Sequence, residues 1–193
     1  MIQEVLKKRN FDINSDRLGP DCPFTHWKLY FKSTMRKLSA KKFLFFGENA
    51  EFRAGAYAIT CSKIHIGNNV IIRPNTMLFA DPRKGDAGSI IIEDDVMIGS
   101  GVHIYVANHR FDDISQPIIL QGHSDAKSVI LKKGCWIGAN SIILAGVIVG
   151  ENSTVLRTSN GGLNWSLIST GTDANLVSVS FGSANIGYAI GGN

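Results

Sequence analysis

The chain has 193 residues, which is enough for one well-buried core and a small appendage. Charged residues make up 19% of it, so the composition does not indicate disorder. The net charge of +4 is only mildly basic. Nucleic-acid binding would need basic and aromatic residues clustered in a recognisable motif, and the repeat region has none. An anionic substrate, or a cofactor that carries phosphates, would explain the excess of basic residues as well as a nucleic acid would. We expect no nucleic-acid partner.

Cysteine usage and the first residues bear on the compartment. Cys22, Cys61 and Cys135 are far apart and form no CxxC pair, which is typical of a reducing compartment and not of a disulfide framework. The opening stretch MIQEVLKKRNFDINSD lacks the apolar core of a signal peptide, and no later apolar run is long enough to cross a bilayer. We therefore expect a cytoplasmic protein.

Residues 1–45 are expected to form an N-terminal helical segment. One helical face of THWKLYFKSTMRKLSAKKF collects Trp27, Tyr30, Phe31, Thr34, Met35 and Leu38. The basic residues lie mostly off that face: Lys28, Lys32, Arg36 and Lys37. Such a helix could cover the open end of a repeat fold, or lie on an anionic membrane. We favour the cap, because a repeat fold requires one, and keep peripheral membrane contact as the alternative.

Residues 46–155 show a period of six. Aliphatic or aromatic residues recur at that interval in runs separated by gaps: Phe46 and Phe52; Ile66, Ile72 and Leu78; Ile92, Ile98 and Ile104; Leu131, Ile137, Ile143, Val149 and Val155. Small or β-branched residues follow most of these by four positions, and Gly, Asn or Asp fills the corners. A period of six fits neither a helix nor a flat strand, but it is typical of a solenoid of short strands and turns. The sequence predicts an all-β solenoid, a parallel β-helix.

Three stretches carry a resemblance to a known family: IGNNVIIRPNT, IEDDVMIGSGVHI and GCWIGANSIILAGVIVGENS. They resemble hexapeptide-repeat acyltransferases of the left-handed β-helix class, over about residues 17–155. The greatest similarity is to sugar O-acetyltransferases of polysaccharide (capsule, exopolysaccharide or lipopolysaccharide) biosynthesis, relatives of the maltose and galactoside acetyltransferases. The resemblance, and not the spacing, implies the left hand, acetyl-CoA as acyl donor, no metal, a sugar or lipid-linked glycan as acceptor, and a homotrimer with its sites between subunits.

Two insertions interrupt the repeat, ADPRKGDAGSI and residues 105–130. Insertions in a repeat array form surface loops and often the binding face. The longer one contains NHRFDD, which resembles the loop in which the family carries its catalytic histidine. Acetyl transfer to a hydroxyl needs a base with a pKa near 7, and the resemblance assigns that role to His109. Either Asp112 or Asp113 could orient the ring, and the sequence does not choose between them.

Other candidate site residues follow from the same resemblance. Asn108, His123 and His103 are expected to contact the acceptor. Trp136, in CWIGAN, matches a tryptophan near the thioester end of CoA, and Ala139 matches a position whose backbone contacts acetyl-CoA. In a trimer, the loop histidine and the tryptophan would act from different chains.

Residues 156–193 depart from the family and form an atypical tail. Leu156 and Arg157 replace an expected Gly-Ala pair, and the coils that help to hold the nucleotide end of CoA have no counterpart. TSNGGLNW, at 158–165, resembles the Asp-box turn of sialidase-like β-propeller repeats, and LVSVSF and GYAIGG resemble the strands that follow it. One such unit does not close a propeller.

Two further functions stay open. The altered tail could leave a catalytically impaired hybrid, or a structural solenoid whose tail mediates interactions. A γ-carbonic-anhydrase-like metalloenzyme is the other, since His65, His103 and His109 loosely resemble its zinc ligands. His103 and His109 are six residues apart, whereas the corresponding zinc ligands of that family are five residues apart. The metalloenzyme is therefore the weaker hypothesis.

Overall fold

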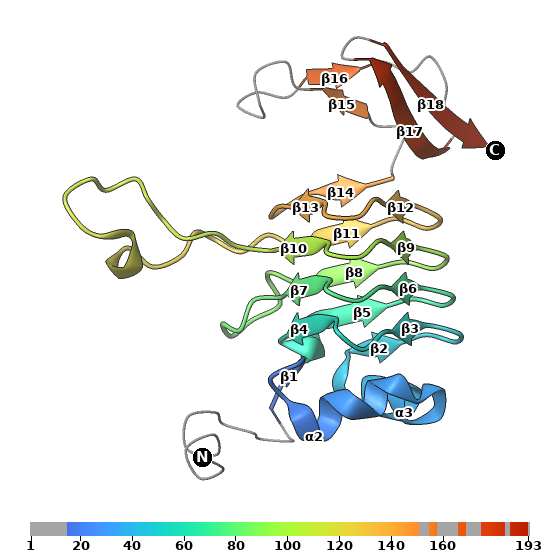
Figure 1. Cartoon of the computed structure of the whole chain (residues 1–193). Coiled ribbons are helices and arrows are strands. Elements are labelled where there is room, and N and C mark those ends of the chain that lie inside the picture. The colour runs from blue at the N-terminus through green and yellow to red at the C-terminus, as the bar shows by residue number, and fades with distance from the viewer. Residues whose placement is uncertain (1–14, 151–154, 158–165, 169–174, 184–185, 193) are drawn as a thin grey trace.

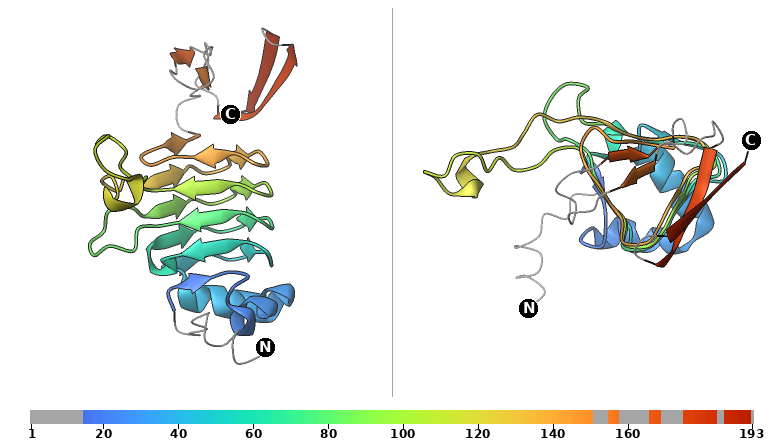
Figure 2. Two further views of the ribbon diagram at one scale, coloured as in Figure 1. Left: turned by 60° about the vertical axis from the view of Figure 1, so that its left-hand side comes forward. Right: turned by 90° about the horizontal axis from the view of Figure 1, so that it is seen from above.

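The computed structural model describes residues 15–150, 155–157, 166–168, 175–183 and 186–192. Short strands wind into stacked coils, with helices at one end and a long loop that projects to one side (Figure 1). Seen along the stack, the coils superimpose as a triangle (Figure 2). The predicted parallel β-helix is confirmed.

Each side of the triangle is a parallel sheet, named here face A, B or C. Face A contains β4 (Tyr57–Ile59), β7 (Met77–Phe79), β10 (His103–Tyr105) and β13 (Ile142–Ile143), with β1 (Arg17–Leu18) added antiparallel to β4. Face B contains β2 (Phe45–Phe46), β5 (Ile64–Ile66), β8 (Ile90–Ile92), β11 (Val129–Leu131) and β14 (Ile148–Val149). Face C contains β3 (Glu51–Phe52), β6 (Ile71–Ile72), β9 (Met97–Ile98) and β12 (Trp136–Ile137).

The period of six places a large apolar side chain of most strands inside the prism, and in β4 the inward residue is Ala58. The register pairs these residues between successive coils, as in Leu78 with Ile104 and Ile104 with Ile143. The interior residues from Phe46 to Ile143 are buried. The smaller residues four positions later are buried too, from Val70 to Cys135, but Val147 in the last coil is exposed. Stacking therefore buries one continuous core, as the repeat predicts.

The corner between faces B and C is built from residues with left-handed backbone. Asn49, Asn69 and Asp95 have φ of 56°, 57° and 61°, a conformation that Asn and Asp tolerate better than most residues. Their side chains form a ladder: Asn49 donates to Asn69 at 3.3 Å, and Asn69 donates to Asp95 at 2.8 Å. The corner residues read from the sequence thus serve both the turn and the stacking.

All insertions leave the prism at the corner between faces A and B. They follow β4, β7 and β10, whereas Leu131 of β11 pairs with Val149 of β14 after an uninterrupted coil. The first insertion holds the short 3₁₀ helix η2 (Cys61–Lys63), and the longest holds η3 (Ile118–Leu120). Because every insertion leaves at one edge, the coil register continues past it unchanged.

Three helices cover the open end of the first coil: α2 (Pro23–His26), the 3₁₀ helix η1 (Trp27–Tyr30) and α3 (Lys32–Lys42). Leu29, Met35 and Phe43 belong to the same buried cluster as Phe46 and Phe52. The described helices therefore lie where the sequence predicts the N-terminal cap.

The predicted helical face is wrong in its first half. Trp27, Tyr30 and Phe31 are exposed, with 74% of Tyr30 accessible, and buried Leu29 takes the inward position. The reason is a break at Phe31, whose extended backbone (φ −112°, ψ 118°) separates η1 from α3. A single helical projection does not apply across that break. It holds for α3 alone, where Met35 is buried and Leu38 packs against the core.

Beyond β14 the pairing changes. β15 (Val155–Arg157) pairs antiparallel with β16 (Ser166–Ile168) and is not part of face C, so the hexad expected at Val155 does not extend the parallel stack. β17 (Asn175–Ser183) and β18 (Ile186–Gly192) form an antiparallel hairpin that includes LVSVSF and GYAIGG. The Asp-box resemblance at 158–165 lies outside the described residues. Among the residues that the structure describes, none of the helices has the length and apolar character needed to span a bilayer.

Candidate active site

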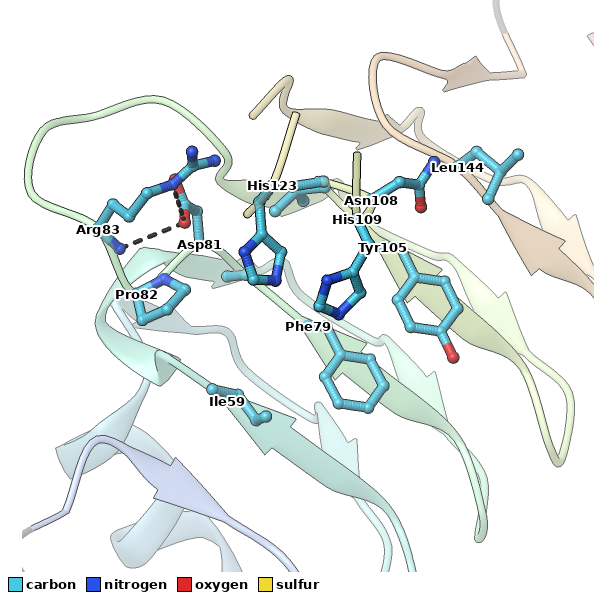
Figure 3. Close-up of a pocket in the computed structure, with 13 residues that line it drawn as sticks. Ile59, Phe79, Asp81, Pro82, Arg83, Tyr105, Asn108, His109, His123 and Leu144 are labelled. Atoms are coloured by element: carbon cyan, nitrogen blue, oxygen red, sulfur yellow. Dashed lines mark hydrogen bonds and ion pairs between the residues drawn. The ribbon is translucent and has the colours of Figure 1, made fainter. Parts of the chain in front are cut away.

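A groove of about 610 Å³ lies where face A meets the two longer insertions (Figure 3). Its lining comes from face A, from the loop after β7 and from the loop after β10: Ile59, Phe79, Ala80, Asp81, Pro82, Arg83, Tyr105, Val106, Ala107, Asn108, His109, His123 and Leu144. The period-six scaffold thus presents one face and two loops to a common space.

The floor of the groove is aromatic. The rings of Phe79 and Tyr105 stack with centroids 5.0 Å apart and planes 6° from parallel. Each residue follows an inward-facing one, Leu78 or Ile104, so the alternation of the strand turns it outward. A half-buried, flat aromatic floor of this kind suits the nonpolar face of a ring-shaped ligand.

Two histidines stand at the groove on the loop after β10. The stem of this loop is a narrow antiparallel ribbon in which His109 forms a β-bridge with His123. Backbone bonds from Arg110 to Gly122 (3.0 Å) and from Ser124 to Asn108 (2.8 Å) flank the bridge. The imidazole centroids are 4.2 Å apart, and Figure 3 shows both rings on the groove side. Either ring could accept a proton from a bound hydroxyl.

An arginine joins the two loops. Arg83 donates from Nε to both oxygens of Asp81, at 2.9 and 3.0 Å, and from Nη2 to the carbonyl of Ser124 at 3.0 Å. The carboxylate of Asp81 is buried, which by itself raises its pKa, but the hydrogen bonds from Arg83 outweigh burial and lower it. A charged Asp81 therefore holds Arg83 across the base of the loop that carries the histidines.

The two predicted orienting carboxylates are engaged elsewhere. Asp112 receives the guanidinium of Arg110 at 2.9 Å, which lowers its pKa. Asp113 accepts from Ser115 and from the side chain of Gln116, and these bonds lower its pKa to about 2. Among the described residues neither carboxylate is hydrogen-bonded to His109, so an orienting role for Asp112 or Asp113 stays a prediction.

The other predicted residues separate into two groups. Asn108 and His123 line the groove, whereas His103 lies outside it and contacts its floor through Tyr105, with Nδ1 3.0 Å from the phenolic oxygen. Trp136 is exposed on face C, and Ala139 lies at the corner beyond it. Within one chain, neither of them reaches the groove that holds His109.

The histidines considered as zinc ligands lie apart. His65 stacks on Phe45 of face B, at 4.7 Å between centroids, while His103 faces outward on face A. In the described ranges no three His, Cys, Asp or Glu side chains come together as a metal-ligand group.

Sequence reasoning missed the aromatic floor and the arginine bridge. A signal for the floor was present, because Phe79 and Tyr105 each stand one residue after the last hexad position before an insertion. No comparable signal identified Arg83, since its partner Ser124 is 41 residues away and only the folded loops bring them together.

Sequence comparisons identify proteins that this chain resembles. A protein-family model described as "Hexapeptide repeat of succinyl-transferase" matches residues 129–156. The galactoside O-acetyltransferase of Lactococcus lactis subsp. lactis (strain IL1403) is 30% identical over 120 residues, which cover 62% of this chain and 54% of that protein. The galactoside O-acetyltransferase of Escherichia coli (strain K12) is 28% identical over 109 residues, covering 56% and 49%. The chain spans about half the length of these curated relatives.

Solved structures share the architecture. A galactoside acetyltransferase in complex with coenzyme A superimposes with a TM-score of 0.61 at 20% identity, covering 78% of this chain and 79% of that one. A maltose O-acetyltransferase from Clostridium difficile 630 gives 0.55 at 19% identity, covering 76% and 83%. The protein has the fold of these structures, which belong to the left-handed parallel β-helix class. Within that class, its sequence is similar to the hexapeptide-repeat O-acetyltransferases.

Proposed function

We propose that this protein is an acetyltransferase that moves an acetyl group from acetyl-CoA to a sugar hydroxyl in polysaccharide biosynthesis. The observation that carries the proposal is the groove. His109 and His123 stand over an aromatic floor, on the face of a β-helix whose relatives are named galactoside O-acetyltransferases. The flat floor of Phe79 and Tyr105 suits a sugar ring, whose axial C–H groups stack on aromatic faces.

The chemistry assigned to His109 is general base catalysis. A sugar hydroxyl is barely ionised at neutral pH, so it attacks a thioester faster when a base removes its proton in the same step. His109 takes that proton while the hydroxyl oxygen bonds to the acyl carbon. The carbon–sulfur bond then breaks, and the proton passes to the departing thiolate. The products are a sugar ester and free CoA, with no metal in the reaction.

Three features support a homotrimeric assembly with the site between subunits. The loop after β10 projects well clear of its own prism (Figure 2). Its tip exposes five large apolar side chains: Phe111, Ile114, Ile118, Ile119 and Leu120. Trp136, the residue matched to the thioester end of CoA, lies on face C, away from the groove of its own chain. A neighbouring subunit would cover the loop tip and bring its Trp136 to His109.

The test is a rate assay on two matched variants, His109→Gln and His123→Gln, with acetyl-CoA and a panel of glycosides. Glutamine keeps the size and polarity of the side chain but cannot act as a base. We expect His109→Gln to lower kcat by about 10²- to 10⁴-fold, as loss of a general base does. We expect His123→Gln to change mainly KM for the sugar. If His109→Gln kept a normal kcat while His123→Gln lowered it, the general base would be His123.

The second candidate is a solenoid that has lost catalysis, and the observation that favours it is the end of the parallel stack at β14. The two functions differ in acetyl-CoA binding. Calorimetry would compare the full chain with a variant whose residues after Val155 are replaced by a family-type terminal coil. Comparable acetyl-CoA binding by the two proteins would support the acetyltransferase. Binding only by the variant with the family-type terminal coil would support the inactive solenoid.

A further inference from the structure

The outer surface of the N-terminal cap carries an exposed aromatic cluster. Trp27, Tyr30 and Phe31 are more than half exposed, as is Phe24 in the preceding turn. The rings of Trp27 and Phe31 meet edge to face at 5.7 Å. Buried Leu29 anchors the turn that displays them, and Thr34 ties it to α3 through a 2.6 Å bond to the carbonyl of Lys28. Contiguous exposed aromatics on a rigid support usually mark an interaction surface.

Helix α3, which continues from this cluster, presents a basic outer face. Met35 and Ser39 are buried against the first coil, and exposed positions of the helix carry Lys32, Arg36, Lys37 and Lys41. A cleft of about 590 Å³ alongside is lined by four lysines, Lys28, Lys37, Lys41 and Lys42. Its one carboxylate, Asp16, is bonded to Ser62. The cap surface therefore combines aromatic rings with clustered ammonium and guanidinium groups.

The charge of the chain is concentrated in this segment. Residues 22–47 contain six Lys and Arg and no Asp or Glu. The whole chain has 20 basic and 16 acidic residues, so the remainder has 14 and 16 and is slightly acidic. The positive excess of the protein is thus entirely in the cap, where it produces a strong local potential.

We propose that the outer face of the N-terminal cap docks onto the surface of an anionic phospholipid bilayer. Tryptophan and tyrosine favour the interface between headgroups and acyl chains, because one part of the ring is apolar and the other is polar. Lysine and arginine are attracted to anionic headgroups within about a Debye length of the surface. The same helices cap the coil with their inner side and bind lipid with their outer side.

The positive charge of the cap favours an anionic bilayer, and not a second copy of this chain, as the partner of its outer face. Two copies meeting cap to cap would bring six basic residues against six others, which is unfavourable. The nearby carboxylates offset this little, because Asp16 is bonded to Ser62 and Asp21 is paired with Arg17. An anionic bilayer offers the complementary charge together with an apolar layer for the rings. The inference stands independently of acetyl transfer.

The test is co-sedimentation of the full chain with vesicles of phosphatidylcholine alone or containing about one-third phosphatidylserine. We expect at least about tenfold tighter binding to the anionic vesicles, and loss of most of it at about 0.5 M salt. The pair Arg36→Glu and Lys37→Glu should reduce binding by about tenfold or more. The pair Trp27→Ser and Phe31→Ser should reduce it as well, and serine at position 31 is a favoured helix N-cap, so α3 is retained.

A matched control changes two exposed basic residues outside the cap, Arg73→Glu and Lys84→Glu, with the same change in net charge. Binding lowered equally by both charge pairs would show that net charge alone is responsible and would overturn the proposal. So would equal binding to neutral and anionic vesicles. Concentration-dependent self-association that is lost in the Trp27→Ser and Phe31→Ser pair, without lipid binding, would identify a second copy as the occupant. Circular dichroism on every variant checks that it is folded.

Discussion

His26 shows how one half-buried side chain couples the cap to pH. Its Nε2 accepts the backbone N–H of Gly55 at 3.1 Å, and its Nδ1 is buried without a hydrogen-bond partner among the described residues. Burial lowers the pKa of His26, and Asp21 opposes this only in part. Protonation of Nε2 would place its new N–H against the N–H of Gly55, which now donates to that nitrogen. The folded cap therefore favours the neutral ring.

The pH dependence follows from that shift. The folded-state pKa lies below the unfolded value of about 6.5, so the unfolded chain binds more protons between the two. The stabilisation is complete above about pH 6.5 and is lost as pH falls through the folded pKa. We expect the urea midpoint of the wild type to fall more steeply from about pH 7.5 to 5.5 than that of His26→Gln, which can still accept from Gly55. His65→Gln is the surface control. Parallel profiles for wild type and His26→Gln would show that His26 does not titrate on unfolding.

At the scale of the element, the coil register should not tolerate an extra residue directly before a strand. One alanine inserted between Val96 and Met97 would turn Ile98 outward and break its pairing with Ile72 and Ile137. Losing the burial of one isoleucine costs about 1.5–3 kcal/mol, and several positions shift together. We expect a loss of more than about 3 kcal/mol in unfolding free energy, measured in urea.

The control for this insertion is the same alanine placed between Ser115 and Gln116 in the projecting loop. There it should change stability by less than about 0.5 kcal/mol, because the surrounding side chains are mostly exposed. Similar stability for the two insertion variants would mean that a strand of the coil can absorb an extra residue as a bulge.

The elements also show how far the sequence determines the structure. The hexad predicted most of the strands and their inward residues, and its interruption marked the loop that carries His109, because every coil repeats the same local structure. Ala58 of β4 was missed, and Val155 does not extend the stack. The cap was predicted as one helix, and its aromatic side was placed inward. Leu29 and Met35 are both buried in the core. Both can point inward because the helix is interrupted at Phe31, and a helical projection cannot predict such a break. Arg83 was missed for a similar reason, since its partners are assembled by two loops.

At the scale of the whole molecule, a site between subunits predicts that two defective chains can restore each other. His109→Gln still supplies a normal Trp136, and Trp136→Ala still supplies a normal His109. In a mixed ring formed by co-expression, about a quarter of the interfaces would join both intact residues. We expect activity at limiting acetyl-CoA to recover to about that fraction of the wild type. No recovery, with mixed assemblies confirmed by mass spectrometry, would place both residues in one subunit's site or exclude Trp136.

The buried cysteines give the stacked coils an internal reporter of unravelling. Burial raises the pKa of Cys61 to about 12 and that of Cys135 to about 11, so neither thiol reacts readily while its coil is closed. Cys61 lies in the insertion that follows the first coil, and Cys135 lies in the fourth coil. Each coil depends mainly on its neighbours. The order in which an alkylating reagent reaches the two sulfurs would therefore tell from which end the solenoid opens, without any engineered label.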